Sequence, residues 1–175
     1  RIEAALIYRA IGDYESALGE VTIAERLSPM RQNFILERGT VLMTAGRHEE
    51  ARDAYLAAYA LSPQFSELAI YAASGYLLTG EDVKAEELLT QHLGTTTVDH
   101  PALVRAYYEA KRYDDLIDLL RTHLASSDSA TARYRLASAY ALAGRYSEAR
   151  REAQATMARY PETIGQGQAF LAGLP

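Results

Sequence analysis

Residues 32–65 read QNFILERGTVLMTAGRHEEARDAYLAAYALSPQF, and this stretch decides the fold. Its apolar and small residues recur every three or four positions, at Ile35, Gly39, Leu42 and then at Ala51, Ala54, Tyr55, Ala58 and Leu61. That spacing indicates two amphipathic helices. Gly46 stands between them, where a left-handed backbone ends a helix, and Pro63 closes the second one. The stretch therefore predicts two antiparallel helices joined by a tight turn.

The same hairpin signature recurs along the chain. A glycine is followed five residues later by an alanine at Gly12 and Ala17, Gly46 and Ala51, Gly80 and Ala85, and Gly144 and Ala149. The first three of these glycines are 34 residues apart. A fixed period of this length is typical of stacked repeats, none of which can bury its apolar face alone. We therefore expect an all-α fold, an α-solenoid of about five helix hairpins with a short C-terminal capping helix.

Small residues are expected to face each other across each hairpin. The pairs are Ala5 with Ala17, Gly39 with Ala51, Ala73 with Ala85, and Ala137 with Ala149. Because these residues lack bulky side chains, the two helix axes can approach closely and the ridges of one helix can fit the grooves of the other.

The small residue, a tyrosine or leucine three positions on, the glycine, the alanine and the closing proline together resemble the tetratricopeptide repeat (TPR). The resemblance covers nearly the whole chain and implies a right-handed α-solenoid in a single domain, residues 1–175. The expected parts are repeats 1–31, 32–65, 66–97, 98–129 and 130–163 and a cap over 164–175.

The repeat over residues 98–129 is degenerate. Lys111 stands where the pattern has glycine, and Leu116 replaces the small alanine. Pro101 suits the first turn of a shortened helix, with Asp99 or a neighbouring residue as its N-cap. We expect the superhelical pitch to change locally at this repeat.

The sequence offers no catalytic constellation. It contains no cysteine, no GxSxG, no HExxH and no phosphate-binding glycine loop. The four histidines lack the spacing to carboxylates that is typical of a metal site. We therefore expect a non-catalytic protein with no cofactor and no metal. An enzyme that combines groove carboxylates with a bound cofactor is the reading with the least support.

Charge is distributed unevenly along the chain. Residues 1–129 carry 12 basic and 20 acidic side chains, a net of −8, whereas residues 130–175 carry 6 basic and 3 acidic, a net of +3. A mostly acidic body argues against nucleic acid as a partner, because that affinity comes from neutralising phosphates. The basic end favours an acidic partner or is simply a solvated helix face.

Compartment and parent protein are left open by the sequence. No apolar run approaches the roughly 18 residues that a membrane span needs, so we expect no direct membrane insertion. The chain begins at Arg1, and we expect it to be a fragment or a processed product. The segments 28–32 and 170–171 are weakly similar to the soluble TPR tails of bacterial O-antigen-ligase-like membrane proteins. This likeness implies a periplasmic location and a bacterial origin, with the cytoplasm as the alternative.

The TPR resemblance also implies a binding site for a protein or peptide. In such arrays the first helix of each hairpin lines a concave groove. The groove-facing candidates are Arg9, Asn33, Thr40, Met43, Thr44, Tyr71, Ser74, Leu78, Arg105, Tyr108, Glu109, Tyr134, Arg135 and Ser138. Tyrosine offers contact area at low entropic cost, and arginine can hold a carboxylate in a bidentate pair.

Two further readings follow from these residues. Arg9, Arg105 and Arg135 together would clamp the C-terminal carboxylate of a peptide, as some TPR domains do. Alternatively, the chain is a structural or self-associating soluble tail of a larger protein, and the partner is then a second copy in a homo-oligomer.

Overall fold

The computed structural model describes residues 1–29 and 31–175. Met30, which belongs to the 28–32 segment compared with the membrane-protein tails, lies outside the described residues. The chain divides into two compact units. Unit 1 comprises Arg1–Thr96 with His100–Ala110, and unit 2 comprises Thr97–Asp99 with Lys111–Pro175. In the described residues the regular elements are α-helices and one short 3-10 turn, as the period predicts.

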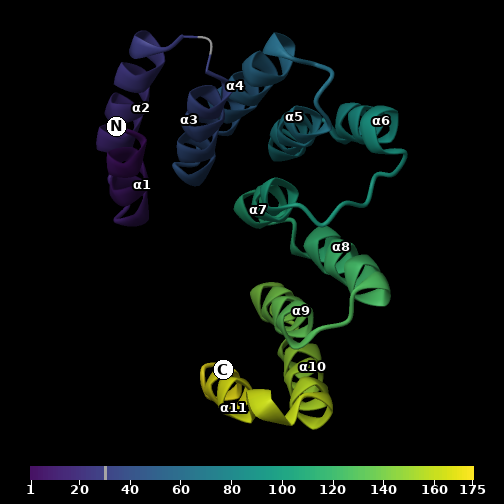
Figure 1. The fold of residues 1–175 in the computed structure, drawn as a ribbon. Helices are drawn as coiled ribbons and strands as arrows, with labels where there is room; N and C mark the ends of the chain where they lie inside the picture. Colours follow the sequence, from purple (N-terminus) through teal and green to yellow (C-terminus); the bar gives the residue numbers. More distant parts are fainter. Residues whose placement is uncertain (30) are drawn as a thin grey trace. The chain divides into compact units, whose positions relative to one another are not determined.

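Unit 1 is a series of helix hairpins (Figure 1). Its helices are α1 (Ile2–Ala10), α2 (Tyr14–Leu27), α3 (Gln32–Thr44), α4 (His48–Leu61), α5 (Ser66–Leu78), α6 (Asp82–Leu93) and α7 (Pro101–Glu109). The two helices of each of the first three hairpins pack together, and α2 packs on α3 and α4 on α5. Helix α7 packs on α5 and also contacts α3. The first helix α7 is therefore a neighbour of both α5 and α3.

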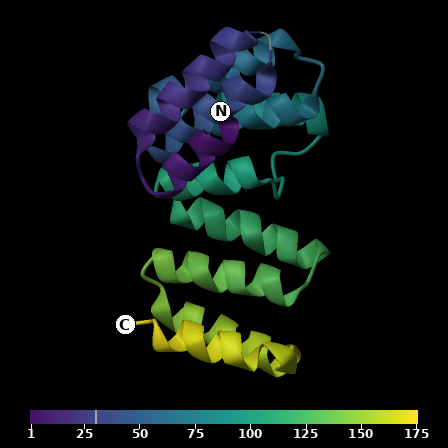
Figure 2. The same ribbon diagram turned by 60° about the vertical axis from the view of Figure 1, so that its left-hand side comes forward.

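Unit 2 contains α8 (Tyr113–Ser126), α9 (Ala130–Leu142), α10 (Tyr146–Arg159), a 3-10 turn η1 (Pro161–Thr163) and α11 (Ile164–Ala172). Helix α9 packs between α8 and α10, and α11 packs on α10 (Figure 2). The expected helix after Pro161 is therefore present. Its buried residue is Gly167, and the phenyl ring of Phe170 lies 6.4 Å from the ring of Tyr134. Ala169 of this helix is exposed.

The hairpin turns depend on a left-handed residue. Gly46 has a φ of 76°, and the N–H of Arg47 donates to the carbonyl oxygen of Leu42 at 2.9 Å, which closes the end of α3. The equivalent glycines adopt the same conformation, at Gly12, Gly80 and Gly144. In the degenerate repeat Lys111 takes this conformation, with a φ of 57°. Lysine is sterically strained in this conformation because of its Cβ, whereas glycine is not.

The predicted small residues all lie in the core. Ala5, Ala17, Ala51, Ala73, Ala85, Ala137 and Ala149 are fully buried, and Gly39 is buried. Gly39 makes its closest approach not to Ala51 but to the ring of Tyr55, one turn further along α4. A second close approach, absent from the predicted pairs, brings Gly75 of α5 against the backbone of Arg52 in α4.

The start of the degenerate repeat follows the prediction in part. Helix α7 begins at Pro101 and is only nine residues long. Its N-cap is His100, whose ring Nδ1 accepts a hydrogen bond from the N–H of Ala102 at 3.2 Å. Asp99 is instead bound to Arg135 of α9. The division between the units falls inside this repeat, between Ala110 and Lys111, and the single domain and the altered pitch remain predictions.

Candidate binding surfaces

Tyr71 lies at the centre of a group of aromatic side chains in unit 1. Its ring is 5.5 Å from that of Tyr55 and 5.6 Å from that of His100, and it is partly exposed. The Tyr55 hydroxyl lies 3.2 Å from Thr40 Oγ1. Burial raises the pKa of Tyr55 and, less strongly, that of Tyr71, so both hydroxyls are neutral hydrogen-bonding groups. Nearby Glu37 raises both pKa values further.

Charged residues flank this aromatic group. Arg9 Nε lies 3.2 Å from Glu37 Oε1, and both side chains are largely buried. Arg105 Nε lies 3.7 Å from Glu109 Oε1. Burial raises the pKa of Glu37, and the charge of Arg9 opposes this; burial likewise raises the pKa of Glu109 against the charge of Arg105. We call the set Arg9, Glu37, Thr40, Tyr71, Arg105, Tyr108 and Glu109 the polar face of unit 1.

Ten of the candidates have accessible side chains. Asn33, Tyr108 and Ser138 are exposed; those of intermediate exposure are Arg9, Thr40, Thr44, Tyr71, Arg105, Glu109 and Arg135. Arg135 and Ser138 lie on α9 in unit 2, and the others of this group lie in unit 1.

The remaining four candidates are buried, and we withdraw them as contact residues. They are Met43, Ser74, Leu78 and Tyr134. Their positions on the first helices turn them toward neighbouring helices, so their surface is used in packing. The Ser74 hydroxyl donates to the carbonyl oxygen of Tyr71, and the Tyr134 hydroxyl donates to that of Thr163.

The arginine clamp for a C-terminal carboxylate is not supported by this arrangement. Arg9 and Arg105 already face Glu37 and Glu109, and Arg135 binds Asp99 through both terminal nitrogens, at 2.6 and 2.9 Å. An arginine whose charge is neutralised within the chain has little left for a second carboxylate.

Glu37 of the polar face and the neighbouring Tyr55 were not predicted from the sequence as contact residues. Glu37 shares the face of α3 with Asn33, Thr40 and Thr44 at spacings of three or four, so the helical period was a signal that could have found it. Tyr55 belongs to a second helix, and its place beside Tyr71 follows only from tertiary packing.

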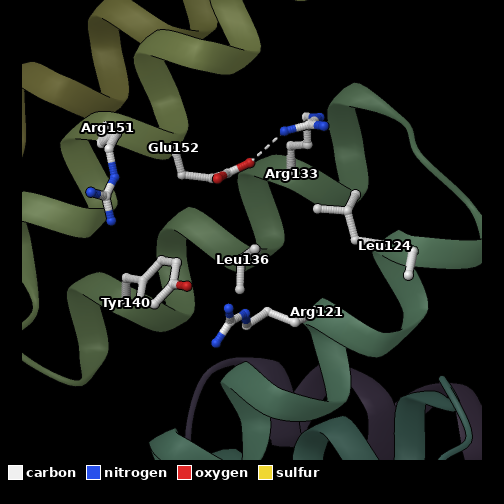
Figure 3. A pocket seen from close by; sticks show the side chains of 8 residues that line it. Arg121, Leu124, Arg133, Leu136, Tyr140, Arg151 and Glu152 are labelled. Carbon is white, nitrogen blue, oxygen red and sulfur yellow. Dashed lines mark hydrogen bonds and ion pairs between the residues drawn. The ribbon is translucent and has the colours of Figure 1, made fainter.

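Unit 2 contains a pocket of about 460 Å³ between α8, α9 and α10. Three arginines line it, together with apolar residues, one tyrosine and one glutamate: Arg121, Leu124, Ala125, Arg133, Leu136, Tyr140, Arg151 and Glu152 (Figure 3). None of them was a predicted contact residue. The excess of basic residues after position 130 was a partial signal for this pocket.

Two kinds of feature were sought in the described part of the chain, a group of metal ligands and a membrane-spanning helix. Within residues 1–29 and 31–175, no three histidine or acidic side chains are grouped to hold a metal ion. No helix in the same residues combines the length and apolar character that a membrane span requires.

The fold is similar to those of solved TPR structures. TTC0263, a TPR protein of Thermus thermophilus, is 16% identical over 98% of this chain and 95% of that one, with a TM-score of 0.61. The kinesin light chain repeats of Podosopora anserina are 20% identical over 93% and 94%, with a TM-score of 0.55. MamA is 17% identical over 94% and 92%, with a TM-score of 0.52. At these identities the likeness shows the fold alone, and it confirms an all-α solenoid.

The search of curated proteins gave no match. The likeness to O-antigen-ligase tails and the bacterial origin therefore stay predictions. The sequence model of the family described as tetratricopeptide repeat matches residues 2–64 and 102–162, which is more than half of the chain. The chain belongs to the tetratricopeptide repeat family.

Proposed function

We propose that this protein is a non-catalytic scaffold and that the polar face of unit 1 binds a peptide segment of a partner protein. TPR proteins bind proteins or peptides in general, and they are typically not enzymes. The observation that carries the proposal is the position of Tyr71. It is partly exposed between Tyr55 and His100, and burial together with the charges of Glu67 and Glu37 raises its pKa.

The chemistry of the polar face suits a peptide. Tyr71 and Tyr108 offer flat, amphipathic surfaces that lose little entropy on binding, and Tyr108 is 42% exposed. Thr40 and the flanking carboxylates can bind backbone amides and cationic side chains. Residues of four successive first helices, α1, α3, α5 and α7, contribute, so an extended segment can cross several hairpins.

The charge of unit 1 favours a basic segment. The unit carries 9 basic and 15 acidic side chains. On the polar face, Glu37 and Glu109 are already paired with Arg9 and Arg105, so the preference for a basic segment rests on the acidic balance of the whole unit. The same acidic balance makes nucleic acid an unsuitable partner.

Capture of a partner from native lysate, followed by titration with the captured protein, tests the proposal. Tyr108→Ala should weaken binding at least roughly tenfold while leaving helicity unchanged. The matched control is Tyr146→Ala, which removes an exposed tyrosine elsewhere. If Tyr108→Ala retains wild-type affinity, the partner does not bind at the polar face.

Self-association is a second candidate, favoured by apolar side chains on the first hairpin. Ile7 of α1 is 63% exposed, Ile11 at the C-cap of α1 is 71% exposed, and Leu27 of α2 is 73% exposed. Exposed apolar groups spaced four residues apart on a helix form a stripe that can be buried against another copy. Sedimentation of the wild type and of Ile7→Glu tests it. A monomer at all concentrations in both proteins would remove this candidate.

A further inference from the structure

We propose that the pocket of unit 2 binds a carboxylate of an acidic peptide segment, together with an adjacent apolar side chain. We call this site the arginine pocket, defined by Arg121, Leu124, Leu136, Tyr140 and Arg151 with the residues around them. It is separate from the polar face of unit 1, and the inference does not rest on the function proposed there.

Two arginines of the pocket are unpaired within the part of the chain that the structure describes. Among these residues, neither the Arg121 nor the Arg151 guanidinium makes a hydrogen bond or an ion pair. Arg133, Arg135 and Arg145 of the same unit, in contrast, each bind a carboxylate. Glu148 lies close enough to Arg151 to feel its charge, but Glu148 is bound by Arg145 at 3.0 Å. Figure 3 shows the side chains of Arg121 from α8 and Arg151 from α10 on either side of Tyr140. Two unpaired guanidinium groups that line one pocket form a site for an anion.

The third arginine is already neutralised. Arg133 lies 2.7 Å from Asp128 and 2.8 Å from Glu152. These contacts fix Glu152, so its carboxylate is paired on the Arg133 side and does not neutralise Arg121 or Arg151. The lining therefore keeps an excess of two positive charges, from three arginines and one glutamate.

Tyr140 supplies a neutral donor beside these charges. Its ring is buried and carries the Arg145 guanidinium on one face, 4.9 Å from the ring centroid. In the described part of the chain its hydroxyl has no hydrogen-bond partner, and Figure 3 shows it pointing into the pocket between Arg121 and Arg151. The Tyr140 hydroxyl and the two guanidinium groups are hydrogen-bond donors that line the pocket and are available to a carboxylate there.

The remaining wall is apolar and determines the kind of ligand. Leu124, Ala125 and Leu136 form the apolar part of the lining, and the pocket has a volume of about 460 Å³. Ligand pockets of roughly 300 to 1,000 Å³ hold molecules much larger than a single ion. A bare inorganic anion would leave the leucines unused, whereas an acidic residue next to an aliphatic one would fill both parts.

The arginine pocket does not coincide with the predicted groove. Arg133, Leu136 and Tyr140 follow one another at spacings of three and four along α9, so they share one side of that helix. The groove candidates Arg135 and Ser138 are each two residues from a pocket residue, which places them about 200° around the helix. A ligand in the pocket therefore leaves the groove side of α9 free.

The test is an NMR titration of the whole chain with three probes, with the Leu124 and Leu136 methyl signals as the readout. The first probe is the acetylated and amidated pentapeptide Gly-Leu-Glu-Leu-Gly, and the second replaces its glutamate with glutamine. The third probe is inorganic phosphate. We expect saturable shifts with the first probe, and affinities lower by roughly tenfold or more for the other two.

Variants locate the binding. Arg121→Gln with Arg151→Gln should lower the affinity for the glutamate peptide by roughly tenfold or more. The control Arg26→Gln with Arg31→Gln changes the net charge equally in unit 1 and should leave the affinity within about twofold. If the first pair disturbs folding, Tyr140→Phe removes only the pocket hydroxyl and should still weaken binding severalfold.

Three results would overturn the inference. The glutamine peptide would bind as tightly as the glutamate peptide, or the Arg121 and Arg151 double variant would keep wild-type affinity. Alternatively, phosphate would bind as tightly as the peptide, which would make the pocket a general oxyanion site and not a peptide site.

Discussion

The ring of Tyr55 lies directly against Gly39 in the second hairpin. A Cβ added at Gly39 would be 2.6 Å from Tyr55 Cδ1 and closer still to Cε1. Tyr55 is fully buried, and its hydroxyl is bound to Thr40, so the ring cannot move aside without cost. A glycine inside a helix normally destabilises it, and here the contact with Tyr55 explains why glycine stands at this position.

Gly39→Ala should therefore lower the free energy of unfolding by about 1–3 kcal/mol through overpacking. Gly19→Ala is the matched control, because Gly19 also lies inside a helix but, among the described residues, has no atoms within 4 Å of an added Cβ. It should stabilise the protein by about 0.5–1 kcal/mol. Urea unfolding of both variants measures the two effects, and a stabilised Gly39→Ala would show that the packing against Tyr55 is misassigned.

Lys111→Gly should stabilise the protein by about 1 kcal/mol. Lys111 has a positive φ where the other hairpins have glycine, and its side chain is exposed, so packing of the side chain offsets little of the backbone strain. Thermal or urea unfolding checks the change. Lys111→Ala removes the same charge without relieving the backbone and should bring no gain, so equal effects of the two substitutions would contradict this explanation.

Arg135→Ala should destabilise unit 2 by about 1–2 kcal/mol, since it leaves Asp99 without its bidentate partner. The Asp99 side chain is 14% exposed and also lies 3.2 Å from His123 Nε2. Arg47→Ala removes the solvated contacts of Arg47 with Glu50 and Glu15 and should destabilise the protein less than Arg135→Ala does. Urea unfolding compares the two, and an equal or smaller loss for Arg135→Ala would mean that Asp99 is solvated.

The pKa values of two carboxylates in unit 1 should be shifted in opposite directions. Burial raises the pKa of Glu37 above the ordinary 4.5, whereas Lys84, Thr79 and Arg52 lower the pKa of Glu81 to about 2. Titration of the side-chain carboxyl carbons by NMR measures both values directly.

The pH dependence of the free energy of unfolding follows from the signs of these pKa shifts. The contribution of Glu37 is present below its unfolded pKa and is lost as the pH rises through its folded pKa. The contribution of Glu81 is present above its unfolded pKa and is lost as the pH falls toward its folded one. A Glu37 pKa at or below the ordinary 4.5 would contradict the burial of Glu37.

Local patterns in the sequence were enough to predict the hairpins. The period, the turn glycines and the buried alanines at Ala17, Ala51, Ala85 and Ala149 are each set by a few neighbouring residues, and the structure contains them. Lys111 and Pro101 also indicated where the repeat pattern weakens, and α7 is shortened there.

The binding surfaces could be predicted only in part, because they depend on which side of each helix its neighbours cover. Met43 and Tyr134 have the same spacing as accessible residues of their helices, yet both are buried. The aromatic pair of Tyr55 and Tyr71 and the pocket between Arg121 and Arg151 join side chains from different helices. No spacing within one helix specifies such a contact.

The most direct test of the proposed function is site-specific photo-crosslinking to the captured partner. A benzophenone side chain replaces Tyr108 on the polar face or, as the control, Val83, which is 69% exposed on α6. We predict that position 108 crosslinks to a basic segment of the partner and that position 83 does not. Equal crosslinking from both positions, or crosslinking from position 83 alone, would contradict binding at the polar face.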